Sequence, residues 1–244
     1  MPTEHRRLHN VILKAPIILA LDTSDLNVAI AWVRATQDLI PVYKLGLEFY
    51  LTCGHDGVRA ISEETESDIF LDLKLHDIPH TVTGAARAIS SLRPKYLTVH
   101  ASGGSAMVAA AVSALPSTFI TGVTILTSLS DSEVASIGFK ENALSSAVTL
   151  AKSAETGGAR AIVCSPLEIL AIRESMGEEM IIITPGVRPA NELTHDDQSR
   201  KMTPREAVDR GANFVVIGRP ITSFWNQGAG AVRERTELIS SQIL

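Results

Sequence analysis

Apolar positions along the chain fall into short runs rich in β-branched residues, and longer stretches of mixed polarity separate these runs. Short apolar runs bounded by polar residues predict buried strands. The runs are Ile17–Asp22, Val42–Leu47, Ile69–Lys74, Tyr96–His100, Phe119–Leu126, Ala161–Ser165, Met180–Thr184 and Phe214–Gly218. In the stretches between them, apolar residues recur every third or fourth position, which predicts helices. Examples are Leu26–Leu39, Thr81–Leu92, Ser105–Leu115, Leu144–Glu155, Pro166–Ser175 and Pro204–Arg210.

Strands that alternate with helical segments indicate βαβ units and a parallel sheet. Eight strands in 244 residues leave about 30 residues for each unit, which is the length of one such module. We therefore predict an α/β protein, a single (β/α)8 TIM barrel over residues 15–244, with a flexible extension over residues 1–14. A doubly wound sheet is the alternative, but Thr23-Ser24-Asp25 follows the first run where a dinucleotide-binding sheet carries a glycine-rich turn.

Composition narrows the class of protein further. Hydrophobic residues make up 45% of the chain, which excludes a largely disordered protein. Lys and Arg number 22 against 27 Asp and Glu, a formal net charge of −5, and without a basic block we expect no nucleic-acid partner. Two distant cysteines outside any CxxC pair favour a reducing compartment. No run is long enough to span a membrane and residues 1–14 lack the apolar core of a signal peptide, so we expect a cytoplasmic protein without membrane contact.

Charged residues gather on one face of the third predicted strand. Side chains alternate along a strand, so Asp72, Lys74 and His76 share the face that points into a barrel, and the apolar residues between them face the helices. The same alternation places Asp22 and Lys44 inward, at the ends of the first and second strands. Asp77 follows just beyond. Active sites of this fold lie at these strand ends.

A structural ion-pair network is the alternative interpretation, but burying each ion costs several kcal/mol, so such charges add little stability. Carboxylates on both sides of a lysine hold it as an ammonium ion, which is unsuited to a Schiff-base nucleophile. The ammonium can stabilise a developing carbanion and then protonate it. A carboxylate beside it repels an anionic substrate group and favours its departure as a neutral product. This pattern is typical of decarboxylation.

The loops after the seventh and eighth strands predict a phosphate site, because barrels of this class bind phosphate there. Arg188 ends the segment Thr184-Pro185-Gly186-Val187-Arg188. In the segment Ile217-Gly218-Arg219-Pro220, the Gly218 backbone can approach an anion, and Arg219 can bind two of its oxygens. The polar stretch between Arg188 and Pro204 is longer than most loops of this kind, which favours a mobile lid over a variable surface loop.

Taken together, these segments resemble the orotidine 5′-monophosphate decarboxylase family. The resemblance extends over nearly the whole chain, and the matching segments occur in the family's order. They are Ala20-Leu21-Asp22, Tyr43-Lys44-Leu45-Gly46, Leu71-Asp72-Leu73-Lys74-Leu75-His76-Asp77-Ile78-Pro79-His80-Thr81, Leu126-Thr127-Ser128, Thr184-Pro185-Gly186-Val187-Arg188, Asp196-Asp197-Gln198 and Ile217-Gly218-Arg219-Pro220.

The resemblance implies a homodimer that converts orotidine 5′-monophosphate to uridine 5′-monophosphate. It makes Lys74 the proton donor to C6 of the pyrimidine after CO2 leaves, with Asp72 near the departing carboxylate. Asp77 would complete the charged array from the second subunit, and Ile78 and Thr81 would also reach across the interface.

The resemblance also assigns the remaining contacts to substrate. Asp22 and Lys44 would bind the ribose hydroxyls, and Lys44 would also belong to the charged array. Thr127, or its neighbour Ser128, would contact the pyrimidine edge. The phosphate would be bound by Arg188, Gln198, Gly218 and Arg219, with Gln198 on the closing lid. No metal and no organic cofactor is implied.

Two other functions remain open at this point. A phosphosugar decarboxylase of the same superfamily, acting on 3-keto-L-gulonate 6-phosphate with Mg²⁺, shares the Asp-x-Lys-x-x-Asp pattern. It is expected to carry an acidic residue where this chain has Lys44, a cation that opposes Mg²⁺ binding. A non-catalytic nucleotide-binding barrel would not need Asp72, Lys74 and Asp77 together. His76 and His80 have a metal-like spacing but straddle Pro79 without an evident third ligand, so we expect no metal there.

Overall fold

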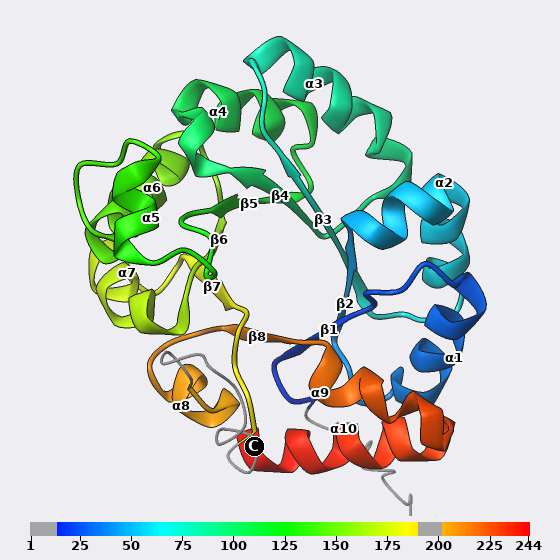
Figure 1. Cartoon of the computed structure of the whole chain (residues 1–244). Helices are drawn as coiled ribbons and strands as arrows, with labels where there is room; N and C mark the ends of the chain where they lie inside the picture. Colours follow the sequence, from blue (N-terminus) through cyan, green and yellow to red (C-terminus); the bar gives the residue numbers. More distant parts are fainter. Residues whose placement is uncertain (1–13, 190–201) are drawn as a thin grey trace, which may run out of the picture.

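The computed structural model describes residues 14–189 and 202–244. Its eight strands are all parallel and close into a barrel in sequence order, with β8 paired to β1 (Figure 1). The strands are β1 Ile17–Ala20, β2 Val42–Gly46, β3 Asp68–Leu75, β4 Tyr96–His100, β5 Phe119–Val123, β6 Ala161–Val163, β7 Ile181–Thr184 and β8 Phe214–Ile217. The prediction of a (β/α)8 barrel is confirmed.

Helices form a ring around the strands (Figure 1). They are α1 Leu26–Thr36, α2 Leu47–Glu63, α3 Pro79–Ala88, α4 Ser105–Ala114, α5 Asp131–Ser136, α6 Ala143–Thr156, α7 Ile169–Met176, α8 Pro204–Asp209, α9 Arg219–Thr222 and α10 Ala229–Ile243. Short 3₁₀ turns are η1 Ser90–Leu92, η2 Ala101–Gly103, η3 Pro166–Glu168 and η5 Ser223–Gln227. Side chains cap the N-termini of several helices. The Asp25 carboxylate accepts hydrogen bonds from the Asn27 and Val28 N–H groups in the first turn of α1, and α5 and α8 each begin with a capping box.

Each predicted strand overlaps an observed one, and the differences lie mainly at the carboxyl ends. The first strand ends at Ala20 rather than Asp22, and the fifth ends at Val123 rather than Leu126. Backbone hydrogen bonding runs one residue further in both cases, since the Leu21 N–H donates to the Lys44 carbonyl oxygen at 2.9 Å and the Thr124 N–H to the Val163 carbonyl oxygen at 3.1 Å. The segments named from periodicity do not include α2, α5, α9 or α10. In α2, Gly54 has a φ of +58° and interrupts the helical path, which weakens the periodic signal.

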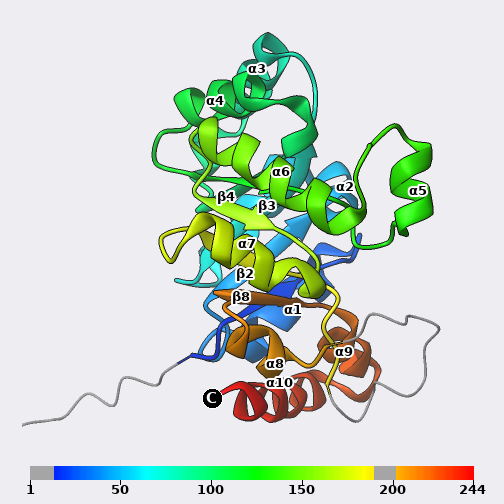
Figure 2. The same cartoon turned by 90° about the vertical axis from the view of Figure 1, so that its left-hand side faces the viewer.

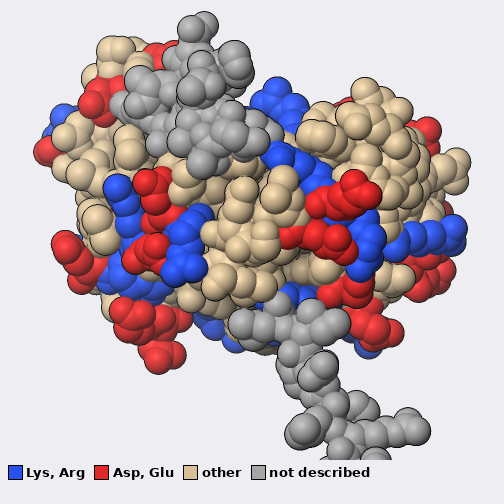
Figure 3. Space-filling model, turned by 90° about the horizontal axis from the view of Figure 1, so that it is seen from below, with Lys and Arg blue, Asp and Glu red and all other residues tan. Residues whose placement is uncertain are grey.

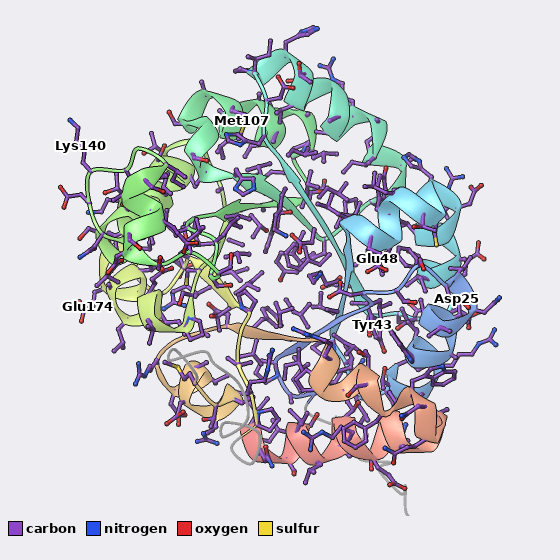
Figure 4. The ribbon with its side chains drawn as sticks, viewed as in Figure 1. Asp25, Tyr43, Glu48, Met107, Lys140 and Glu174 are labelled. Atoms are coloured by element: carbon purple, nitrogen blue, oxygen red, sulfur yellow. The ribbon has the colours of Figure 1, made fainter. Side chains whose placement is uncertain are left out.

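The barrel has two apolar cores. The larger one lies between the strands and the helices, and the smaller one fills the interior of the barrel with Ile18, Val42, Phe70, Tyr96, Ala161 and Ile183. Figure 4 shows side chains filling the space inside the ring of strands. The Tyr96 ring meets Phe70, Phe119 and Phe214 edge-on, with ring centroids 5.6, 5.6 and 6.2 Å away. The interior is therefore packed at this level and is not a channel.

The first described residue is tied to the barrel. Lys14 Nζ donates to the carbonyl oxygens of Gln37 and Ile40, at 2.8 and 3.0 Å. Lys14 is the last residue of the predicted flexible extension, whose other residues lie outside the described ranges. The opposite end of the barrel carries α5, which stands away from the ring of helices (Figure 2).

The face of the molecule drawn in Figure 3 is mixed in charge. On the side that carries α8 and α10, acidic and basic side chains alternate (Figure 3). Ion pairs such as Arg205–Asp209 and Arg233–Asp38 account for part of this pattern. Among the described residues, no helix is both long and apolar enough to cross a membrane.

Candidate active site

A pocket of about 390 Å³ opens at the carboxyl ends of the strands. Its wall combines the charged residues predicted from the first three strands with the predicted phosphate loops. The lining includes Asp22, Lys44, Asp72, Lys74, Thr127, Arg188, Gly218 and Arg219. Phe70, Val123, Val163 and Val216 supply apolar surface. As the alternation of side chains predicted, charged residues from three separate strands line one cavity.

Ion pairs connect the four charged side chains of the first three strands. Lys44 Nζ lies 3.1 Å from Asp22 Oδ1 and 3.3 Å from Asp72 Oδ2. Lys74 Nζ lies 2.8 Å from the other Asp72 oxygen, Oδ1. Signs thus alternate along the row Asp22, Lys44, Asp72 and Lys74. The side chains of Lys44 and Asp72 are only 10% and 13% exposed, whereas Lys74 is 31% exposed and faces the pocket.

The row is held close by a small residue on β2. A Cβ atom added at Gly46 would lie 3.1 Å from Lys44 Nζ and 3.2 Å from Asp22 Oδ1. Any larger side chain there would compete with this ion pair for space. Gly46 therefore allows Lys44 and Asp22 to meet over the end of β2.

An irregularity in β3 presents Lys74 to the pocket. Leu71 pairs with Leu97 on β4, but the next pair is Leu75 with Val99, so Asp72, Leu73 and Lys74 stand opposite Thr98 alone. Lys74 has a φ of +48°, a left-handed conformation that is uncommon outside glycine. Such backbone strain clusters at functional sites. Lys74 does face inward as the alternation predicts, but through a bulge rather than a regular strand.

Electrostatics keep the Asp72 carboxylate ionised. Burial by itself would raise the pKa of Asp72, but the ammonium groups of Lys44 and Lys74 outweigh burial. Hydrogen bonds from Lys74 and from the Thr98 hydroxyl act in the same direction, so the pKa of Asp72 lies below its ordinary value. Asp72 is therefore a fixed negative charge between two cations.

The far side of the pocket is suited to an anion. Gly218 precedes α9, and a Cβ atom added there would lie 3.4 Å from the Ala20 Cβ atom, so the backbone passes close to β1. Arg219 is exposed at the start of α9, and Pro220 occupies its first turn. Arg188 N donates to the Met202 carbonyl oxygen at 3.1 Å, which fixes the start of the loop after β7. Two arginines and a helix start thus meet at one end of the cavity.

Of the remaining predicted site residues, only some line the pocket. Thr127 is exposed and lines the pocket, whereas Ser128 is not among the described residues that line it. Gln198 lies outside the described residues, as does most of the predicted lid. Asp77, Ile78 and Thr81 are exposed at the end of β3 and the start of α3, and this single chain does not bring them to the pocket wall. Asp77 Oδ1 accepts the Ile78 N–H at 2.6 Å.

The histidines lie beside the array. His76 is exposed, and its ring packs against His100, with centroids 5.2 Å apart. Burial, followed by the charges of His76 and Lys74, lowers the pKa of His100. Within residues 14–189 and 202–244, no three His, Cys, Asp or Glu side chains gather as a metal site would require.

Sequence reasoning missed Thr98. This residue is fully buried on β4 and hydrogen-bonds to both Asp72 and Lys74. A threonine inside an apolar strand is ordinary, so its type gives no signal. Alternation could have found it, because Thr98 shares the inward face with Tyr96 and His100.

Comparisons with known proteins agree over most of the chain. A family model described as orotidine 5′-phosphate decarboxylase / HUMPS family matches residues 15–231. An orotidine 5′-phosphate decarboxylase of Thermobifida fusca is 46% identical to this chain over 226 residues, covering 93% of this chain and 97% of the relative. One of Wolbachia pipientis is 44% identical over 218 residues, covering 88% of this chain and 95% of the relative. The crystal structure of orotidine 5′-phosphate decarboxylase from Lactobacillus acidophilus has a TM-score of 0.79 at 32% identity, covering 94% of this chain and 99% of that chain.

Proposed function

Since the chain belongs to the orotidine 5′-phosphate decarboxylase / HUMPS family, we propose that it converts orotidine 5′-monophosphate to uridine 5′-monophosphate and CO2. This makes it a carboxy-lyase. The observation that carries the proposal is the row of alternating charges, Asp22, Lys44, Asp72 and Lys74, in one pocket with an arginine-lined anion end. A carboxylated nucleotide monophosphate needs both halves of that pocket.

The substrate is oriented by its phosphate. Arg188, Arg219 and the backbone at Gly218 bind the phosphate, with Gln198 as a further contact from the loop. Lys44 and Asp22 then bind the ribose hydroxyls, and Thr127 contacts the pyrimidine edge. In this orientation the C6 carboxylate lies over Asp72 and Lys74.

The reaction exchanges a carboxylate for a proton at C6. The bond from C6 to the carboxylate carbon breaks, the electron pair stays on C6, and CO2 leaves. Lys74 Nζ stabilises this carbanion electrostatically and then donates a proton to it. The neutral amine regains its proton from water. Asp72 directs the ammonium through the 2.8 Å contact, and its own charge repels the substrate carboxylate.

Lys44 argues against a metal-dependent route. Its ammonium lies between the carboxylates of Asp22 and Asp72, at 3.1 and 3.3 Å, where a divalent cation would otherwise bind. The array thus supplies its own positive charge, and we propose that the reaction needs no metal or organic cofactor.

The product defines the place of the reaction in metabolism. The product is uridine 5′-monophosphate, so we assign this reaction to the last step of de novo UMP synthesis. Cys53 and Cys164 are both free, which fits a reducing compartment, and we assign the reaction to the cytoplasm.

A second copy of the chain completes the site in this proposal. Ile78 is 65% exposed although it is large and apolar, and it follows Asp77 at the mouth of the barrel. Burial of this segment in a homodimer would bring Asp77, Ile78 and Thr81 to the partner's pocket.

Mixing two inactive variants tests the dimer. In the proposed dimer, each site takes Lys74 from one subunit and Asp77 from the other. A heterodimer of one Lys74→Ala subunit and one Asp77→Asn subunit therefore has both substitutions in one site and none in the other. Random mixing should therefore restore about a quarter of wild-type turnover. Mixed variants that stay as inactive as each variant alone would contradict a shared site.

The activity itself is tested with purified protein, orotidine 5′-monophosphate and EDTA, following the pyrimidine absorbance. We expect rapid conversion to uridine 5′-monophosphate. Tight binding of the product without turnover would instead identify a non-catalytic barrel. Turnover of 3-keto-L-gulonate 6-phosphate that requires added Mg²⁺ would identify the phosphosugar reaction and overturn the proposal.

A further inference from the structure

The bulge in β3 leaves a backbone group without its usual ladder partner. In a regular parallel sheet, the N–H groups of a central strand donate alternately to carbonyl oxygens of its two neighbouring strands. Here Asp72, Leu73 and Lys74 stand opposite Thr98 alone, and Lys74 adopts a φ of +48°. Lys74 has no register partner on β2 or β4, so its N–H needs an acceptor outside the ladder. It finds one in the Thr98 side chain, at 2.8 Å from N to Oγ1.

The same hydroxyl also contacts the catalytic carboxylate. Thr98 Oγ1 donates to Asp72 Oδ1 at 3.0 Å. Asp72 Oδ1 also accepts a hydrogen bond from Lys74 Nζ, at 2.8 Å. One hydroxyl can accept one hydrogen bond and donate another, so both contacts form at once. Thr98 is fully buried, so water cannot replace either contact. The side chain thus links the backbone of Lys74 to the carboxylate that directs its ammonium.

We propose that Thr98 is a positioning residue for the decarboxylation, because its hydroxyl fixes the strained backbone of Lys74 and the Asp72 carboxylate in one geometry. This inference rests on the proposed function. Thr98 does not need to touch the substrate, and it is not among the described residues that line the pocket. It acts by keeping Lys74 Nζ at the distance and angle from which it protonates C6.

The neighbouring strand provides a matched control. Thr121 on β5 is the register partner of Thr98 and is equally buried. Its hydroxyl donates to the Phe119 carbonyl oxygen at 3.0 Å and has no part in the array. Thr98→Val and Thr121→Val therefore remove the same group from the same layer of the barrel, but only the first removes it from the charged residues.

The test compares Thr98→Val with Thr98→Ser, which keeps the hydroxyl, and with Thr121→Val. We expect kcat to fall roughly 10- to 100-fold in Thr98→Val. We expect KM, and the Kd of uridine 5′-monophosphate, to change by less than about threefold, because the phosphate and ribose contacts remain. Thr98→Ser should recover most of kcat, and Thr121→Val should keep it. If Thr98→Val does not fold, Thr98→Ala removes the hydroxyl with the same expected result.

Results that would contradict the positioning role of Thr98 can be told apart from one that would contradict the proposed function. Full kcat in Thr98→Val, or an equal loss in Thr98→Ser, would overturn the role of the hydroxyl. A lower melting temperature with unchanged kcat would show a structural role only, and would also overturn the proposal. Wild-type protein that turns over no orotidine 5′-monophosphate would contradict the proposed function itself, and with it this inference.

Discussion

The lower and upper halves of the barrel interior differ sharply, although the same strands build both. Along β2, β3 and β4, an inward apolar side chain in the lower half is followed two residues later by a polar one in the upper half. The pairs are Val42 and Lys44 on β2, Phe70 and Asp72 on β3, and Tyr96 and Thr98 on β4. The lower layer is held by apolar burial and edge-on aromatic contacts. The upper layer on these strands is held by ion pairs and by the Thr98 hydroxyl.

This difference separates stability from chemistry within one cavity. The lower layer removes apolar surface from water, which stabilises the fold. The upper layer joins four charges by ion pairs and removes two of them, Lys44 and Asp72, almost completely from water, and ion pairs of this kind contribute little net stability. The two layers therefore predict opposite phenotypes. Variants of the charged array in the upper layer should lose turnover and keep the fold, and variants of the lower layer should lose stability and keep turnover in the molecules that remain folded.

The largest effect is expected from Lys74→Ala. Losing both the cation beside C6 and the proton donor should lower kcat by roughly 10²- to 10⁴-fold. The unfolding transition in urea should remain cooperative, because Lys74 is partly exposed and Asp72 keeps its contact with Lys44. Steady-state kinetics and circular dichroism check both parts. Near-normal turnover would remove Lys74 from the mechanism.

Tyr96→Ala should have the opposite phenotype. The ring is buried and meets three other aromatic rings, so its loss should lower the free energy of unfolding by about 3–5 kcal/mol. Urea titration measures this loss. Turnover per folded molecule should stay close to wild type, since Tyr96 is not among the described residues that line the pocket. A kcat that falls as far as in Lys74→Ala would break the division between the layers.

Arg219→Ala tests the anion end of the upper layer. Loss of one charge-assisted contact to phosphate should raise KM by roughly 10- to 100-fold. Arg210→Ala is the matched control, because Arg210 is exposed at the end of α8 and does not line the pocket within the described residues. Initial rates over a range of substrate concentrations give both values. An unchanged KM and kcat in Arg219→Ala would exclude Arg219 from the phosphate site.

The smallest effect is expected from Gly46→Ala. The added Cβ atom would press on Lys44 Nζ and Asp22 Oδ1 by a few tenths of an ångström, so the ribose contacts should shift. KM should rise about threefold to tenfold, because small misplacements of binding groups have modest costs. Gly230→Ala in α10, where an added Cβ meets nothing within 4 Å, is the control. Equal kinetics in the two variants would show that the ion pair tolerates the methyl group.

The sequence was informative where regular geometry holds. Alternation along β2 and β3 placed Lys44 and Asp72 inward correctly, because both lie in the regular register between these two strands. It also placed Lys74 inward, but it could not show the left-handed φ of that residue, because only tertiary contacts with Thr98 support such a conformation. The kink at Gly54 likewise obscured α2.

The roles of other site residues could not be predicted from the periodicity of the sequence. Asp77, Ile78 and Thr81 are exposed here, and their roles came from the resemblance to a family. Those roles remain predictions, as does that of Gln198, which lies outside the described residues. Thr98 shows the converse, since a residue type without any distinctive signal occupies a central position in the hydrogen bonding.

The central claim is that an ammonium group at position 74 carries the chemistry, and chemical rescue tests it most directly. Lys74→Cys is assayed for orotidine 5′-monophosphate turnover before and after aminoethylation, which rebuilds a lysine-like ammonium on the sulfur. Wild-type protein treated in parallel controls for modification of Cys53 and Cys164. We expect an inactive variant that regains turnover on modification. Near-normal turnover before treatment, or no recovery after complete modification, would contradict it.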